Sequence, residues 1–141
     1  MIFYPKQTEE LIQPILYLQE KLKNIQTGIV LISGEMGAGK TTFIRNFVHT
    51  FNPELTVNSP TYNLIHEYKV SENIIFYHFD LYRIKTSEDV GNLGFDEIWG
   101  RQGISLIEWG DIAMEYYPYI NFRVSIETID EKERKIKIIN G

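Results

Sequence analysis

Gly34-Glu35-Met36-Gly37-Ala38-Gly39-Lys40-Thr41 is the stretch that decides the fold of this chain, and Thr42 follows it directly. The stretch has the pattern G-x-x-x-x-G-K-[ST]. The run Ile29-Val30-Leu31-Ile32 before it is apolar and β-branched, and Phe43-Ile44-Arg45-Asn46-Phe47-Val48 after it has helical spacing without a breaker. The sequence therefore predicts that the motif joins a buried strand to the N-terminus of a helix.

The glycines of this stretch predict a loop whose amide hydrogens point at an anion, where the helix dipole adds positive potential. Lys40 would place a positive charge on the transferred phosphate, and the Thr41 hydroxyl would be a ligand of Mg²⁺. A glycine-rich turn that binds nothing is the alternative, and the flanking strand and helix disfavour it. The predicted nucleotide contacts are Glu35, Met36, Gly37, Ala38, Gly39, Lys40, Thr41 and Thr42.

Length and composition predict one globular domain over residues 1–141, because a chain of 141 residues is about one domain long. Hydrophobic residues make up 43% and charged residues 23%, which is ordinary for a soluble protein. No apolar run approaches the ~20 residues of a membrane span, so the expected location is cytoplasmic. The chain has no cysteine, which excludes disulfides and thiolate metal sites.

The formal net charge is −5 and the sequence pI is about 5.2, which argues against a broad polyanion-binding face on this chain alone. Any nucleic acid that the protein serves is therefore expected to be bound by a partner. The densest basic cluster lies near the C-terminus and alternates with Glu131 and Glu133, so we interpret it as a solvated strand face. It comprises Lys132, Arg134, Lys135 and Lys137.

Apolar residues at helical spacing after Thr8 predict an amphipathic helix. Pro14 leaves two possible starts. Thr8-Glu9-Glu10 caps a short first turn that kinks at the proline, or, as we favour, the helix opens with Pro14. Further helices are predicted over residues 41–50, after Thr86 and over 111–117, and strands over 55–57, 64–70, 74–79, 103–107, 122–127 and 134–138. The fold predicted is a three-layer α/β sandwich of the P-loop NTPase type, with a parallel central sheet and antiparallel edge strands.

Two predicted strands end in an acid, Asp80 and Glu108. Hydrolysis of a bound nucleotide needs a carboxylate that holds the magnesium shell or orients the attacking water. Ligands of open α/β sheets bind at the carboxyl ends of the strands, where these acids would lie. Each acid taken alone could also be a loop residue or a helix cap. Thr61, in the predicted loop Asn58-Ser59-Pro60-Thr61-Tyr62, could reach the γ-phosphate or its metal, although Ser-Pro-Thr is often only a turn.

The motifs, in this order and spacing, resemble those of the bacterial TsaE family, also called YjeE. They are Gly34 to Thr42, Ser59-Pro60-Thr61-Tyr62, Tyr77-His78-Phe79-Asp80-Leu81-Tyr82-Arg83, Leu93-Gly94 and Ile107-Glu108-Trp109. The resemblance spans nearly the whole chain. His-x-Asp-x-Tyr-Arg together with Glu-Trp is specific, whereas the phosphate loop alone is not. The family usually carries proline after Glu-Trp, and this chain has Gly110 there.

The resemblance implies a weak, partner-dependent ATPase that uses ATP and Mg²⁺. It would serve the formation of N6-threonylcarbamoyladenosine at position 37 of tRNAs that read ANN codons, in a complex with the TsaB and TsaD proteins that brings it to tRNA. Carried onto this chain, it makes Lys40, Asp80 and Glu108 catalytic and Thr41, Asp80 and Glu108 the metal ligands, with Thr61 in a switch-like loop. Which acid is the base stays open. Tyr82, Arg83 and Trp109 either pack around the nucleotide or face a partner.

Three rival interpretations stand against this one. A GTPase would need Asn-Lys-x-Asp to recognise guanine, and this tetrapeptide is absent from the sequence. A small-molecule P-loop kinase would need an arginine-rich lid, whereas the arginines of this chain are scattered. A binding module whose nucleotide gates a partner without turnover is the third interpretation.

Overall fold

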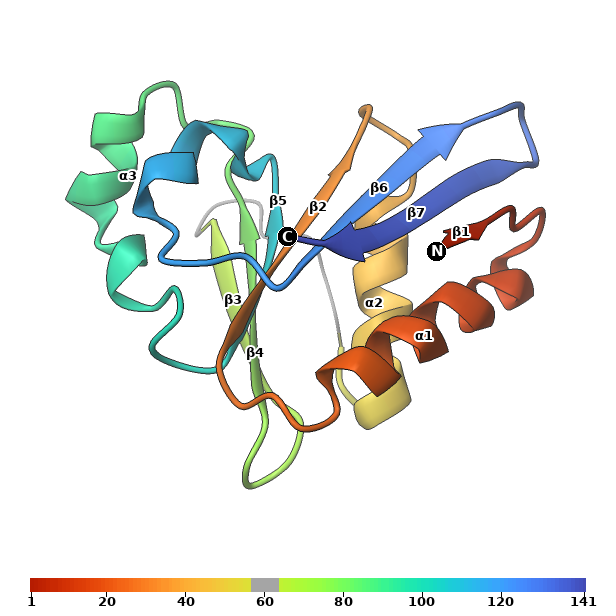
Figure 1. Cartoon of the computed structure of the whole chain (residues 1–141), viewed down its shortest axis with the longest axis horizontal. Coiled ribbons are helices and arrows are strands. Elements are labelled where there is room, and N and C mark those ends of the chain that lie inside the picture. The colour runs from red at the N-terminus through yellow and green to blue at the C-terminus, as the bar shows by residue number, and fades with distance from the viewer. Residues whose placement is uncertain (57–63) are drawn as a thin grey trace.

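The structure is a computed structural model of the chain, and it describes residues 1–56 and 64–141. The elements, in order, are β1 (Ile2–Phe3), the 3₁₀ helix η1 (Thr8–Leu11), α1 (Ile12–Leu22), β2 (Gly28–Gly34), α2 (Lys40–Phe51), β3 (Ile65–Lys69), β4 (Ile75–Asp80), α3 (Ser87–Leu93), η2 (Phe95–Glu97), β5 (Ile104–Glu108), η3 (Gly110–Tyr116), β6 (Phe122–Thr128) and β7 (Arg134–Asn140). The described strands form one sheet in the order β1-β7-β6-β2-β5-β4-β3 (Figure 1).

The centre of this sheet is parallel. β2 pairs in parallel with β6 on one side and with β5 on the other, and β5 pairs in parallel with β4. The antiparallel strands β7, β1 and β3 lie outside these four. The predicted fold class is therefore confirmed. Continuous burial of the first five residues of β2 explains its central place, since parallel strands need cover on both faces.

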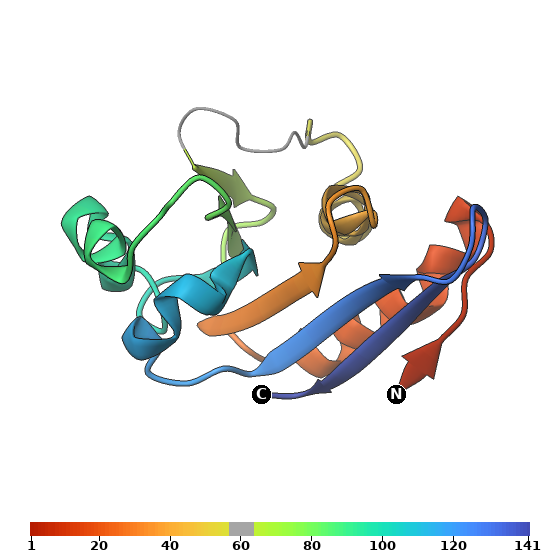
Figure 2. The same cartoon turned by 90° about the horizontal axis from the view of Figure 1, so that it is seen from above.

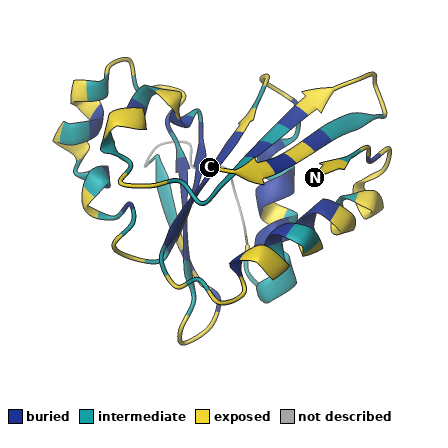
Figure 3. Ribbon diagram, viewed as in Figure 1, coloured by how far each residue is buried: buried dark blue, intermediate teal, exposed yellow. Residues whose placement is uncertain are grey.

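Alternate residues of β2 feed two separate hydrophobic clusters. Val30 and Ile32 pack with the buried faces of α1 and α2, whereas Ile29 and Leu31 pack with Trp99 and with residues of α3, η2 and η3. Viewed from above, α3 and α2 lie on opposite sides of the strands (Figure 2). Buried residues run along the central strands and the inner side of α2 (Figure 3). Period-two alternation thus gives three layers.

Helix α2 extends one residue beyond each end of its predicted span. Its buried residues Phe43, Ile44, Phe47 and Val48 recur at helical spacing, and the ring centroids of Phe47 and Phe76 lie 5.4 Å apart. Asn52 ends the helix in an extended conformation just before Pro53, as expected for a residue that precedes proline. The helix that follows the glycine-rich motif is therefore anchored against the sheet along its length.

The favoured start of the first helix was wrong. α1 begins at Ile12, two residues before Pro14, and the 3₁₀ turn η1 precedes it. A proline is tolerated as the third helical residue because the first four amide groups of a helix have no intrahelical acceptor. The alternative with a short first turn over Thr8-Glu9-Glu10 describes the chain better, although no side chain caps that turn.

Three smaller differences have local causes. Leu55 and Thr56 are not in a strand, and the rest of the predicted strand 55–57 lies outside the described residues. The helix predicted from Asp111 is a 3₁₀ helix that kinks at Ala113, where φ is −112° and ψ is 16°. β1 was not predicted, because two exposed or half-buried residues on the sheet edge carry no periodic signal.

The two predicted hairpins are both present. β3 pairs with β4, and β6 pairs with β7, each in antiparallel fashion. The predicted cap of α3 is also confirmed, since the Thr86 hydroxyl accepts a hydrogen bond from the Asp89 amide at 3.2 Å. Local turn and cap chemistry therefore identified these connections correctly.

We predict that Trp99→Ala lowers the free energy of unfolding by about 3–5 kcal/mol, because it would leave a large cavity under the outer helices. Trp99 is fully buried, and its ring lies 4.8 Å from that of Tyr117 and 5.4 Å from that of Phe79. Urea denaturation of both proteins measures the difference. Leu93→Ala, at a half-exposed position of α3, is the control and should cost less than about 0.5 kcal/mol. Equal losses for both variants would contradict the assignment of Trp99 to the core.

Candidate active site

The loop between β2 and α2 opens its backbone toward solvent-filled space. Gly37 has φ of 80° and Gly39 has φ of 106°, both in the left-handed region that favours glycine. No heavy atom lies within 4 Å of the point where a Cβ would stand at either position. A turn in which the Ala38 amide donates to the Glu35 carbonyl at 3.0 Å fixes the middle of the loop. These features fit a backbone that wraps an anion at a helix N-terminus.

Lys40, the first residue of α2, is a buried cation inside this loop. Its Nζ donates to the Gly34 carbonyl at 2.5 Å and to the Glu35 carbonyl at 3.0 Å, and it lies 4.4 Å from the centroid of the Trp109 ring. Burial lowers the pKa of Lys40, and the charges of Glu108 and Asp80 oppose that shift. A buried ammonium group attracts an anion strongly because water screens its charge little, and the two nearby acids reduce that attraction.

The sheet brings the two acids from distant parts of the sequence to one place. Asp80 ends β4 and Glu108 ends β5, and the parallel register pairs these two residues directly. Register with β2 places Glu108 beside Ile32, just before the phosphate loop. The Thr41 hydroxyl donates to Glu108 Oε2 at 3.3 Å. Asp80, Glu108, Lys40 and Thr41 therefore lie around one point at the carboxyl ends of the strands.

A pocket of about 340 Å³ occupies this point. It is lined by residues of the loop between β2 and α2 and by two aromatic side chains, Tyr82 and Trp109, whose ring centroids lie 5.0 Å apart. The lining residues are Met36, Gly37, Gly39, Lys40, Thr41, Thr42, Asp80, Tyr82, Glu108 and Trp109. Of the predicted contacts, Glu35 and Ala38 do not line this pocket, although both belong to the loop that shapes it.

Trp109 reaches the pocket through a strained backbone conformation. Its φ is 58° and its ψ is 39°, which costs a non-glycine residue about 1–2 kcal/mol. Gly110 follows in a crowded place, since a Cβ there would lie 2.8 Å from the Tyr117 hydroxyl. That hydroxyl donates to the Gly110 carbonyl at 2.8 Å. The glycine that departs from the usual Glu-Trp-Pro pattern thus matches close packing against Tyr117.

The donor set fits a nucleotide with magnesium. Thr41, Asp80 and Glu108 offer the hard oxygen ligands that Mg²⁺ prefers, and Mg²⁺ commonly binds through one or two carboxylates together with phosphates and water. Within residues 1–56 and 64–141, no group of three or more histidine, aspartate or glutamate side chains could hold a metal ion by itself. Phosphate oxygens from a ligand would therefore have to complete such a site.

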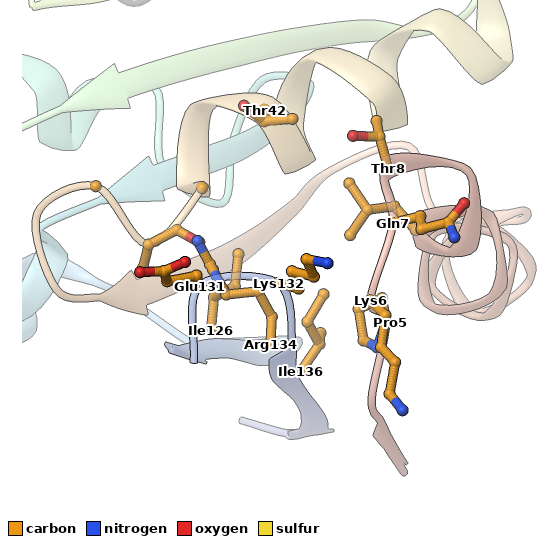
Figure 4. Close-up of a pocket in the computed structure, with 14 residues that line it drawn as sticks. Pro5, Lys6, Gln7, Thr8, Thr42, Ile126, Glu131, Lys132, Arg134 and Ile136 are labelled. Carbon is orange, nitrogen blue, oxygen red and sulfur yellow. The ribbon is translucent and has the colours of Figure 1, made fainter. Parts of the chain in front are cut away.

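A second pocket, of about 420 Å³, lies on the other side of the same loop. It shares Gly37, Gly39 and Thr42 with the first pocket. Figure 4 shows Thr8 from the N-terminal turn, Thr42 from α2, and Lys132 and Arg134 from the β6–β7 hairpin around one space. Two pockets thus adjoin the same loop. One contains Asp80 and Glu108, and the other is lined by the N-terminal segment and the β6–β7 hairpin.

Sequence reasoning missed two contributions to this region. The basic cluster near the C-terminus is only partly a solvated strand face, because Arg134 lies on the same face of β7 as the buried Ile136. Its Nε donates to the Ala38 carbonyl at 3.2 Å, which ties the hairpin to the phosphate loop. Period-two alternation with Ile136 was the signal that could have found it.

The second missed residue is His78, whose Nε2 lies 2.6 Å from Glu108 Oε2. The sequence places it in the motif Tyr77 to Arg83 but predicts no role for it. Thr61, the remaining predicted contact, lies outside the described residues with the rest of Asn58–Tyr62, so its placement stays a prediction.

The structure is a three-layer α/β protein with a parallel sheet centre, and the loop between β2 and α2 has the pattern G-x-x-x-x-G-K-[ST]. The family model described as "Threonylcarbamoyl adenosine biosynthesis protein TsaE" matches residues 5–136. The chain therefore belongs to the TsaE family.

Individual relatives agree with this assignment. The chain is 43% identical over 114 residues to the tRNA threonylcarbamoyladenosine biosynthesis protein TsaE of Rickettsia felis, a match that covers 80% of this chain and 66%, just under two thirds, of that protein. It is 35% identical over 138 residues to the Rickettsia bellii protein of the same name, covering 91% and 94%. The crystal structure of Bacillus subtilis YdiB superposes with a TM-score of 0.74 at 25% identity, covering 100% of this chain and 86% of YdiB.

None of the helices within the described part of the chain has the length and apolar character needed to cross a membrane.

We predict that Asp80→Asn stabilises the protein near neutral pH. The pKa of Asp80 is raised, mainly because burial disfavours its charged form and further because Glu108 is near. The folded state then binds the proton more tightly than the unfolded state, so stability falls as the pH rises from 3.8 through the higher folded pKa. Asparagine keeps an oxygen that can accept the hydrogen bond that the Tyr82 amide donates to Asp80 Oδ1 at 3.0 Å. The substitution should therefore raise the free energy of unfolding by less than about 1 kcal/mol.

Urea denaturation across acidic and neutral pH measures this effect, and the gain should vanish below the unfolded pKa. Asp130→Asn is the control of opposite sign. Backbone hydrogen bonds from Glu133 and Lys132 lower the pKa of Asp130, so its stabilisation is present at neutral pH and lost on acidification. A loss of stability for Asp80→Asn at neutral pH would contradict the raised pKa.

Proposed function

We propose that this chain is an ATPase that binds ATP with Mg²⁺ and hydrolyses it during formation of the threonylcarbamoyl group on adenosine 37 of tRNAs that read ANN codons. One observation carries the proposal. The phosphate loop with its buried Lys40 shares a single pocket with two acids from other strands, Asp80 and Glu108. A protein that only bound phosphate would have no use for acids there, because they repel the ligand.

The two pockets suit the two parts of ATP. The β- and γ-phosphates would lie in the pocket that contains Lys40 and the acids. The base and sugar would extend across Thr42 into the second pocket, where Leu11, Ile126 and Ile136 offer apolar surface and Lys132 and Arg134 offer donors (Figure 4). A nucleoside triphosphate is long enough to need both, and both adjoin the same loop glycines.

Each residue near the phosphates has a chemical task in this proposal. Lys40 and the loop amides stabilise the negative charge that develops on the transferred phosphoryl group. Thr41 and one of the acids would hold Mg²⁺. When bound, Mg²⁺ would neutralise part of the negative charge of the phosphates. The other acid orients water for attack on the γ-phosphorus. Asp80 and Glu108 are both candidates for this last task.

The proposed partners are TsaB and TsaD proteins, with tRNA bound through the complex in the cytoplasm. Two considerations support them. The chain belongs to a family named for threonylcarbamoyl adenosine biosynthesis. Its net charge of −5 is unfavourable for binding tRNA on its own surface. The hydrolysis cycle would then reset the partner's active site between rounds of modification.

Phosphate release by the purified protein with ATP and Mg²⁺ tests the proposal, alone and with TsaB, TsaD and tRNA. We expect slow release alone and faster release in the complex. Glu108→Gln should reduce release in the complex by about a hundredfold or more, because a carboxylate in this position contributes to proton transfer or water orientation. Stoichiometric formation of a phosphorylated metabolite would instead indicate a small-molecule kinase, and ATP binding without release in the complex would indicate a binding module.

We predict that Lys40→Ala lowers the affinity for ATP by about 10-fold to 100-fold, because backbone amides cannot replace a charged hydrogen bond to phosphate. Isothermal titration calorimetry with Mg²⁺ present measures the dissociation constant. Lys23→Ala removes an exposed lysine whose partner, Glu20, lies 3.6 Å away on α1, and it should leave the affinity unchanged. Undiminished ATP binding by Lys40→Ala would count against the phosphate-loop assignment.

A further inference from the structure

His78 is buried completely beneath the pocket without lining it. It lies on β4 between Phe76 and Asp80 on the side of the sheet that α2 covers, and its exposed fraction is 0%. Its Nε2 lies 2.6 Å from Glu108 Oε2. Its Nδ1 has no hydrogen-bond partner among the residues that the structure describes. Burying a polar side chain that makes a single hydrogen bond costs free energy of folding, so that hydrogen bond is expected to have a function.

The partner fixes the direction of this hydrogen bond. A carboxylate ion only accepts hydrogen bonds, so beside an ionised Glu108 the proton of the pair belongs to Nε2 of His78. The distance of 2.6 Å is short, as is usual for a donor that faces a charged oxygen. Glu108 Oε2 thus receives donors from His78 and, at 3.3 Å, from Thr41.

The two donors to Glu108 differ in what else they can do. The Thr41 hydroxyl lines the pocket and is a candidate metal ligand, so ligand binding competes with its hydrogen bond to Glu108. His78 is not among the lining residues and has no contact with the pocket to lose. Its hydrogen bond therefore remains available whether or not a ligand is bound.

We propose that His78 is a positioning residue, whose Nε2–H holds the Glu108 carboxylate against the phosphate loop. The inference rests on the proposed function, in which Glu108 holds Mg²⁺ or orients the attacking water. A glutamate side chain has three rotatable bonds, and fixing them by a donor behind the carboxylate leaves the second oxygen, Oε1, for the pocket. Residues of this kind, one layer behind the ligands, typically change metal affinity or activity by about 10-fold to 100-fold when they are removed.

Two variants separate this role from simple packing. His78→Gln keeps an N–H donor where Nε2 stands, whereas His78→Leu fills the space without a donor. We expect His78→Leu to slow phosphate release by about tenfold or more and His78→Gln to restore most of the rate. The dissociation constant for ATP without Mg²⁺ should change by less than about threefold in both, because His78 does not touch the ligand. Ser105→Ala, a buried polar position on the neighbouring strand β5, is the matched control and should change neither quantity.

A double-mutant cycle tests whether His78 acts through Glu108. The measured quantity is the factor by which Mg²⁺ tightens ATP binding, which needs no turnover. If Glu108 is the acid that holds Mg²⁺, we expect His78→Leu and Glu108→Gln to reduce this factor about equally, and the double variant to reduce it no further than either. Additive losses would overturn the proposal. If wild-type protein released no phosphate even with its partners, the proposed function would fail, and this cycle would still decide the role of His78.

Nuclear magnetic resonance gives a readout of the His78 tautomer that needs no ligand. Long-range ¹H–¹⁵N correlations distinguish the imidazole tautomers, and His78→Gln assigns the signal among the three histidines of the chain. We expect the proton of His78 on Nε2, with nitrogen shifts that change in Glu108→Gln. A proton on Nδ1 alone, or nitrogen shifts of His78 that stay unchanged in Glu108→Gln, would overturn the proposal.

Discussion

The candidate site depends on three parallel strands that end at the same level. β2, β5 and β4 lie side by side in parallel, and their register places the end of β2 beside Glu108 and Glu108 beside Asp80. No local sequence signal joins Lys40 to Asp80, which is 40 positions away. Their proximity is a consequence of pairing geometry, because parallel strands put all their carboxyl ends at one edge of the sheet. Burial on both faces fixes that register, since a slip of one residue would turn apolar side chains to the wrong layer.

The electrostatics of the site oppose the stability of the fold. Burial disfavours the charge on Lys40 and on Asp80 alike, and each acid partly offsets the cost of the cation. The left-handed backbone of Trp109 adds strain beside the same pocket. Buried charges and strained backbone of this kind are common at functional sites, where the surrounding structure holds them in place. Here the two hydrophobic clusters on either side of the sheet supply that surrounding structure.

The sequence predicted most of the fold because its strongest signals are local. The apolar run into the phosphate loop, the two hairpins and the Thr86 cap each depend on a few neighbouring residues. Where a signal was weak or ambiguous, prediction failed: two residues of β1 have no period, and Pro14 is compatible with more than one helical position. The contacts of His78 and Arg134 with Glu108 and Ala38 join separate elements, so only the folded structure reveals them.

The hydrogen bonds of Lys40 indicate how this loop would accept the proposed phosphate without rearranging. An ammonium group has three donors, and the carbonyls of Gly34 and Glu35 take two of them. The third faces the region of the Trp109 ring, whose attraction for a cation is weak beside that of a phosphate oxygen. A phosphate would therefore replace a cation–π contact and leave both carbonyl bonds intact. Because those bonds already hold the lysine in place, little side-chain entropy remains to be lost on binding, and the loop is preorganised for the ligand that we propose.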